Sequence, residues 1–254
     1  MRQIEPRTYR NHFRNENLVY FSVKVKEADV YIGLTSSSFY TGLPGEMFMV
    51  LSNLMFQLET YIAIYPEFQT SLVPLKPDVN VCPIVKDMFD ASEKAGTGPM
   101  AAVAGAINLY LAKALVKYAK PEEWLIENGG DVYCKFNHEV NFAVYAGKSP
   151  LSGKIGIKIP GSHFPVGVCT SSGTVGHSFS FGKADAACVV SSDVCLADAL
   201  ATQLGNQISN PDDLEGMVSL FSQDPLVMGS LAVLGDRCAM AGDIQFTLLN
   251  NNVV

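Results

Sequence analysis

A carboxylate and a hydroxyl lie one helical turn apart in the segment ADALAT, residues 197–202. Residues four positions apart share one face of a helix, so Asp198 and Thr202 would point in the same direction. Oxygen ligands of these two kinds bind hard cations such as Mg²⁺. An isolated Asp on a helix is more often solvated, and a Thr often bonds back to its own helix. The segment therefore indicates Asp198 and Thr202 as candidate metal ligands, with a solvated helix face as the alternative.

The stretch VGVCTSSGTVGHSFSFGKADA, residues 166–186, concentrates polar and reactive side chains. Its imidazole, His177, follows a glycine and titrates near neutral pH, which suits a general base. We expect Cys169 where a strand becomes a loop, beside hydroxyls and free N–H groups that would stabilise a thiolate. The alternative is a loop whose Ser and Thr side chains bond its own backbone. The hydroxyl residues next to the cysteine are candidate ligand-binding residues: Thr170, Ser171 and Ser172.

The segment GTGPMA, residues 96–101, fits the glycine pattern G-x-G-x-x-A of dinucleotide-binding loops. That pattern requires a strand before the first glycine, whereas the preceding VKDMFDASEKA has helical spacing. We therefore expect a turn that opens a helix and directs free N–H groups toward a phosphate or carboxylate, or else a tightly packed helix entry. The GKS triplet of GKSPLSGK is no P-loop, because Phe142 stands where the first glycine is needed. The ligand-binding candidates in the turn are Gly96, Thr97 and Gly98.

Hydrophobic periodicity predicts which segments are strands and which are helices. Alternation around Glu27–Asp29 predicts a hairpin over residues 20–34, and the fold class is α+β because strands dominate both ends with helices between them. We expect one domain, residues 1–254, with residues 1–15 as a loosely ordered N-terminal tail. The other expected strands are 124–136, 140–147, 154–159 and 186–192, with two more within 229–249. Within 124–136, the glycines of the step 128–131 are expected to supply the positive φ angles of a tight turn or a bulge. The expected helices are 45–65, a helix from Pro99 to Pro121, 194–205 capped by Ser192 or Asp193 and ended by Gly205, and 212–224.

Composition and charge exclude several classes of protein. A net charge of −7 leaves no basic stripe for nucleic acid, and the arginines at 2, 7, 10 and 14 are expected to form a solvated tail. The most apolar window, 47–65, contains five polar residues, so we expect a buried helix rather than the about 20 apolar residues of a membrane span. The six cysteines form no C-x-x-C pair, and the start of the sequence lacks the features of a secretory signal. We expect a cytoplasmic protein without disulfides.

These segments, in this order and together with ENGGDVY, residues 127–133, make the chain resemble the ApbE-type flavin transferase superfamily, and more closely an uncharacterised branch of it. The resemblance covers roughly residues 95–205. It implies an ApbE-like fold, with antiparallel or mixed sheets and packed helices, and a cleft for FAD or FMN beside Mg²⁺. Asp198 and Thr202 would be the metal ligands, with a backbone oxygen near Ala197. His177 corresponds to the histidine of an H-x-x-D-P-x-T-G loop, although SFSFGKADA follows it here. The residues matching the glycine turn of the cleft are Asn128, Gly129, Gly130 and Asp131.

Three functions are compatible with these residues. The first is metal-assisted binding of a flavin nucleotide by an enzyme or group transferase, with a protein as acceptor. The second is transfer of sulfur or a persulfide by a nucleophilic Cys169. The third is nucleotide binding without catalysis.

Overall fold

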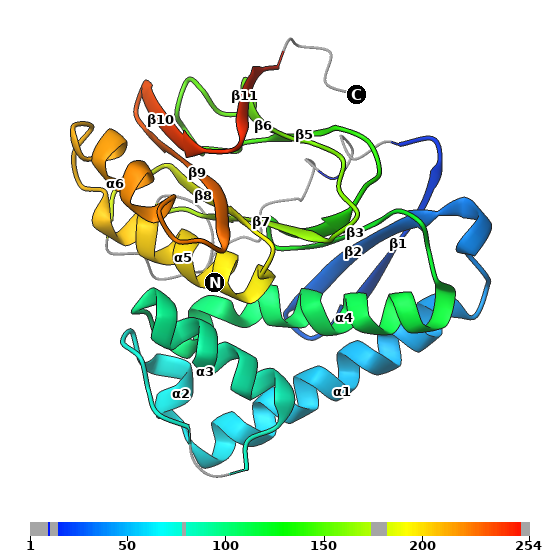
Figure 1. Ribbon diagram of the computed structural model, residues 1–254. Coiled ribbons are helices and arrows are strands. Elements are labelled where there is room, and N and C mark those ends of the chain that lie inside the picture. The colour runs from blue at the N-terminus through cyan, green and yellow to red at the C-terminus, as the bar shows by residue number, and fades with distance from the viewer. Residues whose placement is uncertain (1–9, 11–14, 78–79, 174–181, 250–254) are drawn as a thin grey trace.

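The protein folds into three layers, which Figure 1 shows from the helices at the bottom, through a large central sheet, to a small sheet at the top. The computed structural model describes residue 10 and residues 15–77, 80–173 and 182–249. Strands and helices form separate layers instead of alternating along the chain, which confirms the α+β class.

All neighbouring strands in both sheets are antiparallel. The central sheet has eight strands in the order β1-β2-β3-β4-β7-β8-β9-β10, and the second sheet has the order β11-β6-β5. The strands of the central sheet are β1 Leu18–Val25, β2 Ala28–Thr35, β3 Trp124–Asn128, β4 Asp131–Lys135, β7 Val166–Ser171, β8 Ala186–Ser191, β9 Val227–Leu234 and β10 Arg237–Gly242. Those of the second sheet are β5 Val140–Ala143, β6 Ile155–Ile159 and β11 Gln245–Leu248.

Two short turns decide the pairing in the first half of the central sheet. The hairpin expected over residues 20–34 is confirmed, with Lys26 at a φ of 52° in the turn between β1 and β2. Between β3 and β4, Gly129 and Gly130 have φ angles of 70° and 106°. Two successive positive φ angles match the twist of an antiparallel hairpin. Residues 124–136 are therefore two strands joined by a tight turn, one of the two structures expected for the glycine step, and not one continuous strand with a bulge.

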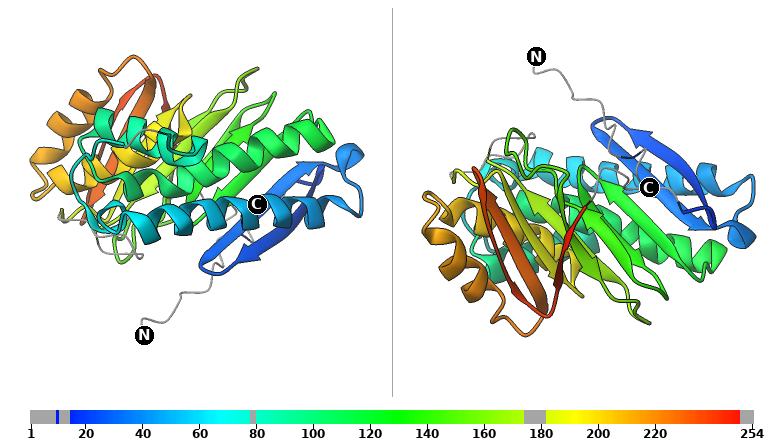
Figure 2. Two further views of the ribbon diagram at one scale, coloured as in Figure 1. Left: turned by 90° about the horizontal axis from the view of Figure 1, so that it is seen from below. Right: turned by 90° about the horizontal axis from the view of Figure 1, so that it is seen from above.

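The helices cover one face of the central sheet, as both views of Figure 2 show. The side chain of Asp193 caps α5 by accepting hydrogen bonds from the backbone N–H groups of Cys195 and Leu196. α5 continues past Gly205, where its end was expected, because this glycine is buried with Gly182 packed against its carbonyl. The helices are α1 Leu43–Ile64, α2 Glu67–Thr70, α3 Pro83–Ala95, α4 Val103–Ala119, α5 Val194–Gln207 and α6 Asp213–Phe221, with 3₁₀ turns η2 Ser36–Ser38 and η3 Pro99–Ala102.

The middle of the central sheet is buried on both faces. In β8, Ala187 and Val189 face the helices, while Ala186, Cys188 and Val190 face the second sheet. Covering both faces requires apolar residues at every position of a strand, and this explains the uninterrupted run AACVV. The C-terminal segment contributes three strands where two were expected, because β11 leaves the central sheet and pairs with β6.

The sequence predicts that α1 is a buried helix, but only one side of it is buried. The side that packs on β1 and α4 is buried, whereas Met49 and Phe56 on the other side are about two-thirds exposed. By length and composition alone, α1 and the segment Pro99–Ala119 could each cross a membrane. In this fold both helices pack in the layer that covers the central sheet.

Candidate functional site

Two buried carboxylates, Asp131 and Asp198, come together from distant parts of the sequence. Asp131 is the first residue of β4, directly after the glycine turn, and Asp198 lies in the middle of α5. Each is 9% exposed. Oδ1 of Asp131 accepts a hydrogen bond of 3.0 Å from the backbone N–H of Thr170, and Oδ2 of Asp198 accepts one of 2.8 Å from that of Gly105. The interpretation of Asp198 as a solvated helix residue is therefore wrong.

Burial favours the protonated state of both carboxyl groups. Burial raises the pKa of Asp131 to about 7, although the hydrogen bond from Thr170 opposes this and the charge of Glu127 adds to it. Burial also raises the pKa of Asp198 well above its usual range, and the neighbouring charge of Asp131 raises it further. Ionised carboxylates that are buried side by side repel each other. A bound cation would remove that repulsion, so the pair is suited to holding one.

A glycine allows α4 and α5 to approach closely at this point. A Cβ atom added to Gly105 would lie 2.4 Å from the carbonyl oxygen of Val194 and 3.0 Å from Cβ of Asp198. The backbone N–H of Gly105 reaches the Asp198 carboxylate because no side chain intervenes. Gly105 thus lets a second helix, α5, pack directly against α4.

Three buried polar atoms lack a hydrogen-bond partner within the part of the chain that the structure describes: Thr97 Oγ1, Asn108 Oδ1 and Ser171 Oγ. The other end of the Asn108 amide donates a 2.9 Å hydrogen bond to the carbonyl oxygen of Asp131. Ser171 directly follows Thr170, which binds Asp131. A buried polar atom without a partner costs about 1–3 kcal/mol. Buried polar atoms without hydrogen-bond partners, next to a pair of carboxylates, are what a binding site for a polar ligand would contain.

The remaining metal candidate, Thr202, lies one turn beyond Asp198 on α5 and is half-buried. Across the described residues, no group of three His, Cys, Asp or Glu side chains is placed to hold a metal ion. A cation at Asp198 would therefore take further ligands from hydroxyl, backbone or ligand oxygens, which is the coordination that Mg²⁺ accepts. The residues present fit such an ion.

The two glycine-containing turns differ in what surrounds them. A Cβ atom on Gly129 or Gly130 would meet nothing within 4 Å, so the space in front of that turn is open. In the turn before η3, a Cβ atom on Gly96 would lie 3.8 Å from Nε2 of Gln203 on α5, close in sequence to Thr202. Gly98 packs against the backbone of Ser71, where a Cβ atom would lie 1.8 Å from a carbonyl oxygen. Gly98 thus serves tight packing, whereas Gly129 and Gly130 leave room for a ligand.

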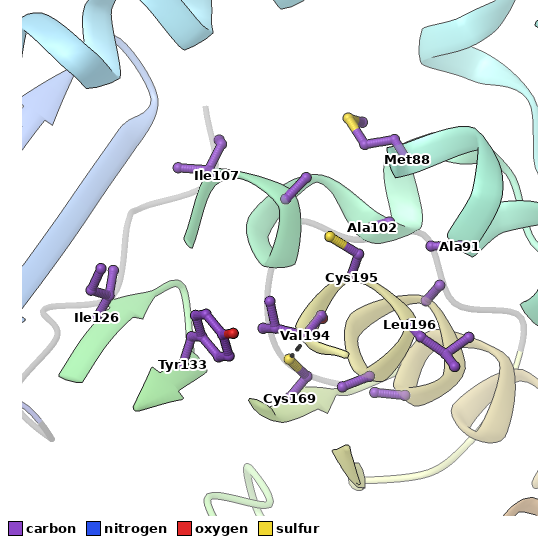
Figure 3. Packing of buried hydrophobic residues seen from close by; sticks show 14 of the residues in the cluster. Met88, Ala91, Ala102, Ile107, Ile126, Tyr133, Cys169, Val194, Cys195 and Leu196 are labelled. Atoms are coloured by element: carbon purple, nitrogen blue, oxygen red, sulfur yellow. Dashed lines mark hydrogen bonds between the residues drawn. The ribbon is translucent and has the colours of Figure 1, made fainter. Parts of the chain in front are cut away.

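Cys169 lies in the middle of β7 instead of at a strand end, paired with Val189 of β8. It is fully buried, and its thiol donates a weak hydrogen bond to the carbonyl oxygen of Val194, drawn as a dashed line in Figure 3. Burial, followed by the nearby charges of Asp131 and Asp198, raises the pKa of Cys169 well above its usual range. This environment opposes a thiolate, so the expected setting for a reactive cysteine is wrong.

The other candidate residues of the stretch 166–186 lie in different positions. His177 lies within residues 174–181, outside the described residues. Thr170 and Ser171 belong to β7, and Ser172 follows it. The backbone N–H of Thr170 is hydrogen-bonded to the Asp131 carboxylate.

Sequence reasoning missed an ion-pair network beside the glycine turn. Nε of Arg10 lies 2.5 Å from Oε2 of Glu127, and another nitrogen of the same guanidinium lies 2.7 Å from Oδ1 of Asp29. Oε1 of Glu127 accepts a hydrogen bond of 2.8 Å from the N–H of Gly130. Arg10 is therefore not part of a solvated tail, while the arginines at 2, 7 and 14 lie outside the described residues. The available signal was a Glu directly after the apolar run WLI of β3.

A family model described as AbpE bacteria matches residues 10–217 of this chain. A UPF0280 protein of Methanocella arvoryzae is 43% identical over 190 residues, which cover 73% of this chain and 75% of that protein. A UPF0280 protein of Methanococcus aeolicus is 42% identical over 191 residues, 74% of this chain and 77% of that protein.

Two solved structures share the fold. The apo flavinyl transferase ApbE of Pseudomonas stutzeri superimposes with a TM-score of 0.58 at 13% identity, covering 88% of this chain and 93% of that one. The flavin transferase ApbE of Vibrio cholerae gives a TM-score of 0.53 at 11% identity, covering 89% and 97%. Likeness at such low identity establishes the ApbE-like fold and leaves the reaction to the site.

Proposed function

The chain belongs to the AbpE bacteria family, and from that premise we propose that it is a metal-assisted enzyme that binds a flavin nucleotide and transfers a group from it. FAD or FMN is the proposed ligand class and a protein hydroxyl the proposed acceptor class; that two flavin transferases share the fold supports a flavin ligand. The observation that carries the proposal is the buried pair Asp131 and Asp198. Burying two neighbouring carboxylates costs free energy unless a ligand neutralises their charge.

Asp198 and Thr202 would hold Mg²⁺, with the Asp131 carboxylate next to it. When bound, the ion would neutralise the charge of a nucleotide diphosphate. The chain contributes fixed geometry, because the backbone N–H groups of Gly105 and Thr170 hold the two carboxylates in place. Donors fixed before the ligand arrives need no reorganisation during the reaction.

The open side of the Gly129–Gly130 turn and the free hydroxyls of Thr97 and Ser171 would receive polar atoms of the nucleotide. His177 is proposed as the base that takes a proton from the acceptor hydroxyl, by its correspondence with the transferase histidine. This role is separable from binding, since His177 is not needed to hold the cation.

The test is FAD binding by the purified protein, followed through quenching of flavin fluorescence with and without Mg²⁺, together with chromatographic detection of released FMN. We expect Mg²⁺-dependent binding that Asp198→Asn and Thr202→Val each weaken by at least about tenfold, as for lost metal ligands. Asp212→Asn is the matched control, because that side chain is 93% exposed and loses the same charge. Absence of FAD binding in Mg²⁺, or wild-type binding by Asp198→Asn, would overturn the proposal.

Nucleotide binding without turnover is the second candidate, and the sequence SFSFGKADA after His177 favours it because the Asp–Pro and Thr–Gly steps of the transferase loop are missing. His177→Ala separates the two. An enzyme loses FMN release and keeps FAD binding, whereas a binding protein has no FMN release to lose.

Sulfur transfer at Cys169 is not carried forward, because that thiol is fully buried and its pKa is raised. Alkylation of the native protein should modify the exposed Cys238 and leave Cys169 unmodified. We place the protein in the cytoplasm, a proposal that the six free thiols support because reducing compartments preserve them.

A further inference from the structure

The outer side of α1 is apolar and exposed over most of its length. Phe48, Met49, Phe56 and Ile64 are between 45% and 67% exposed, and no charged residue occurs between Glu46 and Glu59. The opposite side of the helix is buried against the fold. A helix that is apolar on all sides is normally buried on all sides, and no segment among the described residues covers this surface.

A groove of about 660 Å³ runs between α1 and α4. α1 contributes residues from Glu46 to Gln57, and α4 contributes residues from Tyr110 to Tyr118. The left view of Figure 2 shows the two helices side by side on the outside of the molecule. They run in opposite directions, because Tyr118 at the end of α4 interacts electrostatically with Tyr40, which bonds Glu46 at the start of α1.

The exposed side of α1 and the groove lie next to each other and extend along the same stretch of helix. Two copies of the chain can therefore place their α1 helices antiparallel, so that each α1 lies in the α1–α4 groove of the other copy. The result is a layer of four helices related by a two-fold axis, in which each copy provides both the ridge and the groove. We propose that this groove is a homodimer interface occupied by α1 of a second copy.

Charges at the edge of the groove complement each other in this arrangement. Lys113 and Lys117 line the groove on α4, and neither forms an ion pair with any residue that the structure describes. Lys117 lies at the level of Glu46 on its own α1. If the two-fold axis passes midway between Met49 and Phe56, Lys117 of one copy lies opposite Glu59 of the second copy. Glu59 is 43% exposed even while it pairs with Lys26 of its own chain.

The first test is the molar mass of the full chain by sedimentation equilibrium over a range of concentrations. We expect a dimer for the wild type and a monomer for Met49→Asp/Phe56→Asp, with a dimer dissociation constant raised at least about 100-fold, as for two central interface residues. Far-UV circular dichroism of each variant verifies that the fold is kept. Phe164→Asp is the matched control, because Phe164 is 76% exposed and lies between β6 and β7, away from the groove.

A charge exchange tests the register with two exposed residues whose replacement leaves the core intact. Lys117→Glu and Glu59→Lys should each raise the dimer dissociation constant several-fold, because each places like charges opposite one another. The double variant Lys117→Glu/Glu59→Lys should return the constant toward that of the wild type. A monomeric wild type, a dimer that survives Met49→Asp/Phe56→Asp, or a double variant weaker than both single ones overturns the proposal. So does a monomeric wild type that floats with phospholipid vesicles, which would identify the surface as a membrane face.

Discussion

The carboxylate site and the outer face of α1 depart from the usual distribution of residues in opposite ways. At the site, charged groups are buried and held by backbone N–H groups, with Asp131 and Asp198 each 9% exposed. On α1, large apolar side chains such as Met49 and Phe56 are about two-thirds exposed. Buried charge and exposed apolar surface are each informative, because folding alone favours neither.

The difference shows what kind of partner each region requires. Buried carboxylates are compensated by a small, strongly charged ligand that enters the fold. An exposed apolar face is compensated by another surface of similar size that excludes water. The two regions lie on different helices, α5 and α1, so either can be altered while the other is measured.

The largest effect on the free energy of unfolding is expected at the Arg10–Glu127 pair, the buried ion pair beside the glycine turn of the carboxylate site. Glu127 is fully buried, and Arg10→Met would remove the guanidinium that contacts its carboxylate. Removing one partner of a buried ion pair costs about 3–5 kcal/mol, and urea denaturation should show that loss. Replacing both residues, Arg10→Met/Glu127→Leu, should recover part of it, because the buried charge of Glu127 is removed together with the guanidinium. A loss below about 1 kcal/mol for Arg10→Met would match the cost of an exposed pair and would make Arg10 a solvated residue after all.

The next effect concerns the ion that the carboxylates are proposed to bind. At a Mg²⁺ concentration 100-fold above its dissociation constant, the free energy of unfolding should rise by about 2.7 kcal/mol. Asp198→Asn should abolish this increase without destabilising the metal-free protein, because the amide still accepts the Gly105 hydrogen bond and no longer repels Asp131. Thermal unfolding with and without Mg²⁺ measures both quantities. A destabilised metal-free Asp198→Asn variant would mean that the carboxylate serves the fold.

A smaller effect is expected from Gly105→Ala, which adds one methyl group where α4 crosses α5. That group would lie 2.4 Å from the carbonyl oxygen of Val194, so the helices must separate at a cost of about 1–3 kcal/mol. Gly216→Ala on α6 is the matched control, because its Cβ would meet nothing within 4 Å. The control should stabilise the protein by about 0.5–1 kcal/mol through helix propensity. Equal effects of the two substitutions would show that the close approach of α4 and α5 carries no constraint.

Local patterns in the sequence predicted the elements of this fold well. The hairpin of β1 and β2, the positive φ angles at Gly129 and Gly130, and the α5 cap at Asp193 all depend on residues close to one another in the chain. The transfer of β11 to the second sheet depends on pairing with the distant strand β6, and local patterns do not contain that information.

The same distinction separates what could and could not be predicted at the site. ADALAT and the glycine turn identified Asp198 and Asp131, and the structure brings the two together. Nothing near Cys169 in sequence shows that β7 is covered on both faces, so its burial was missed. Arg10 and Glu127 are separated by 117 positions, and no spacing rule connects them.

The smallest effect on the free energy of unfolding of the monomer is expected for substitutions on the exposed face of α1. Met49→Ser/Phe56→Ser should change the free energy of unfolding of the monomer by less than about 0.5 kcal/mol, because these side chains have few contacts to lose within their own chain. Urea denaturation at a concentration low enough to dissociate the wild type measures this. At high concentration the wild type should become more stable than the variant, since association stabilises only the folded state that can associate. If the variant is destabilised equally at every concentration, α1 is covered by its own chain, and the contrast between the two regions is lost.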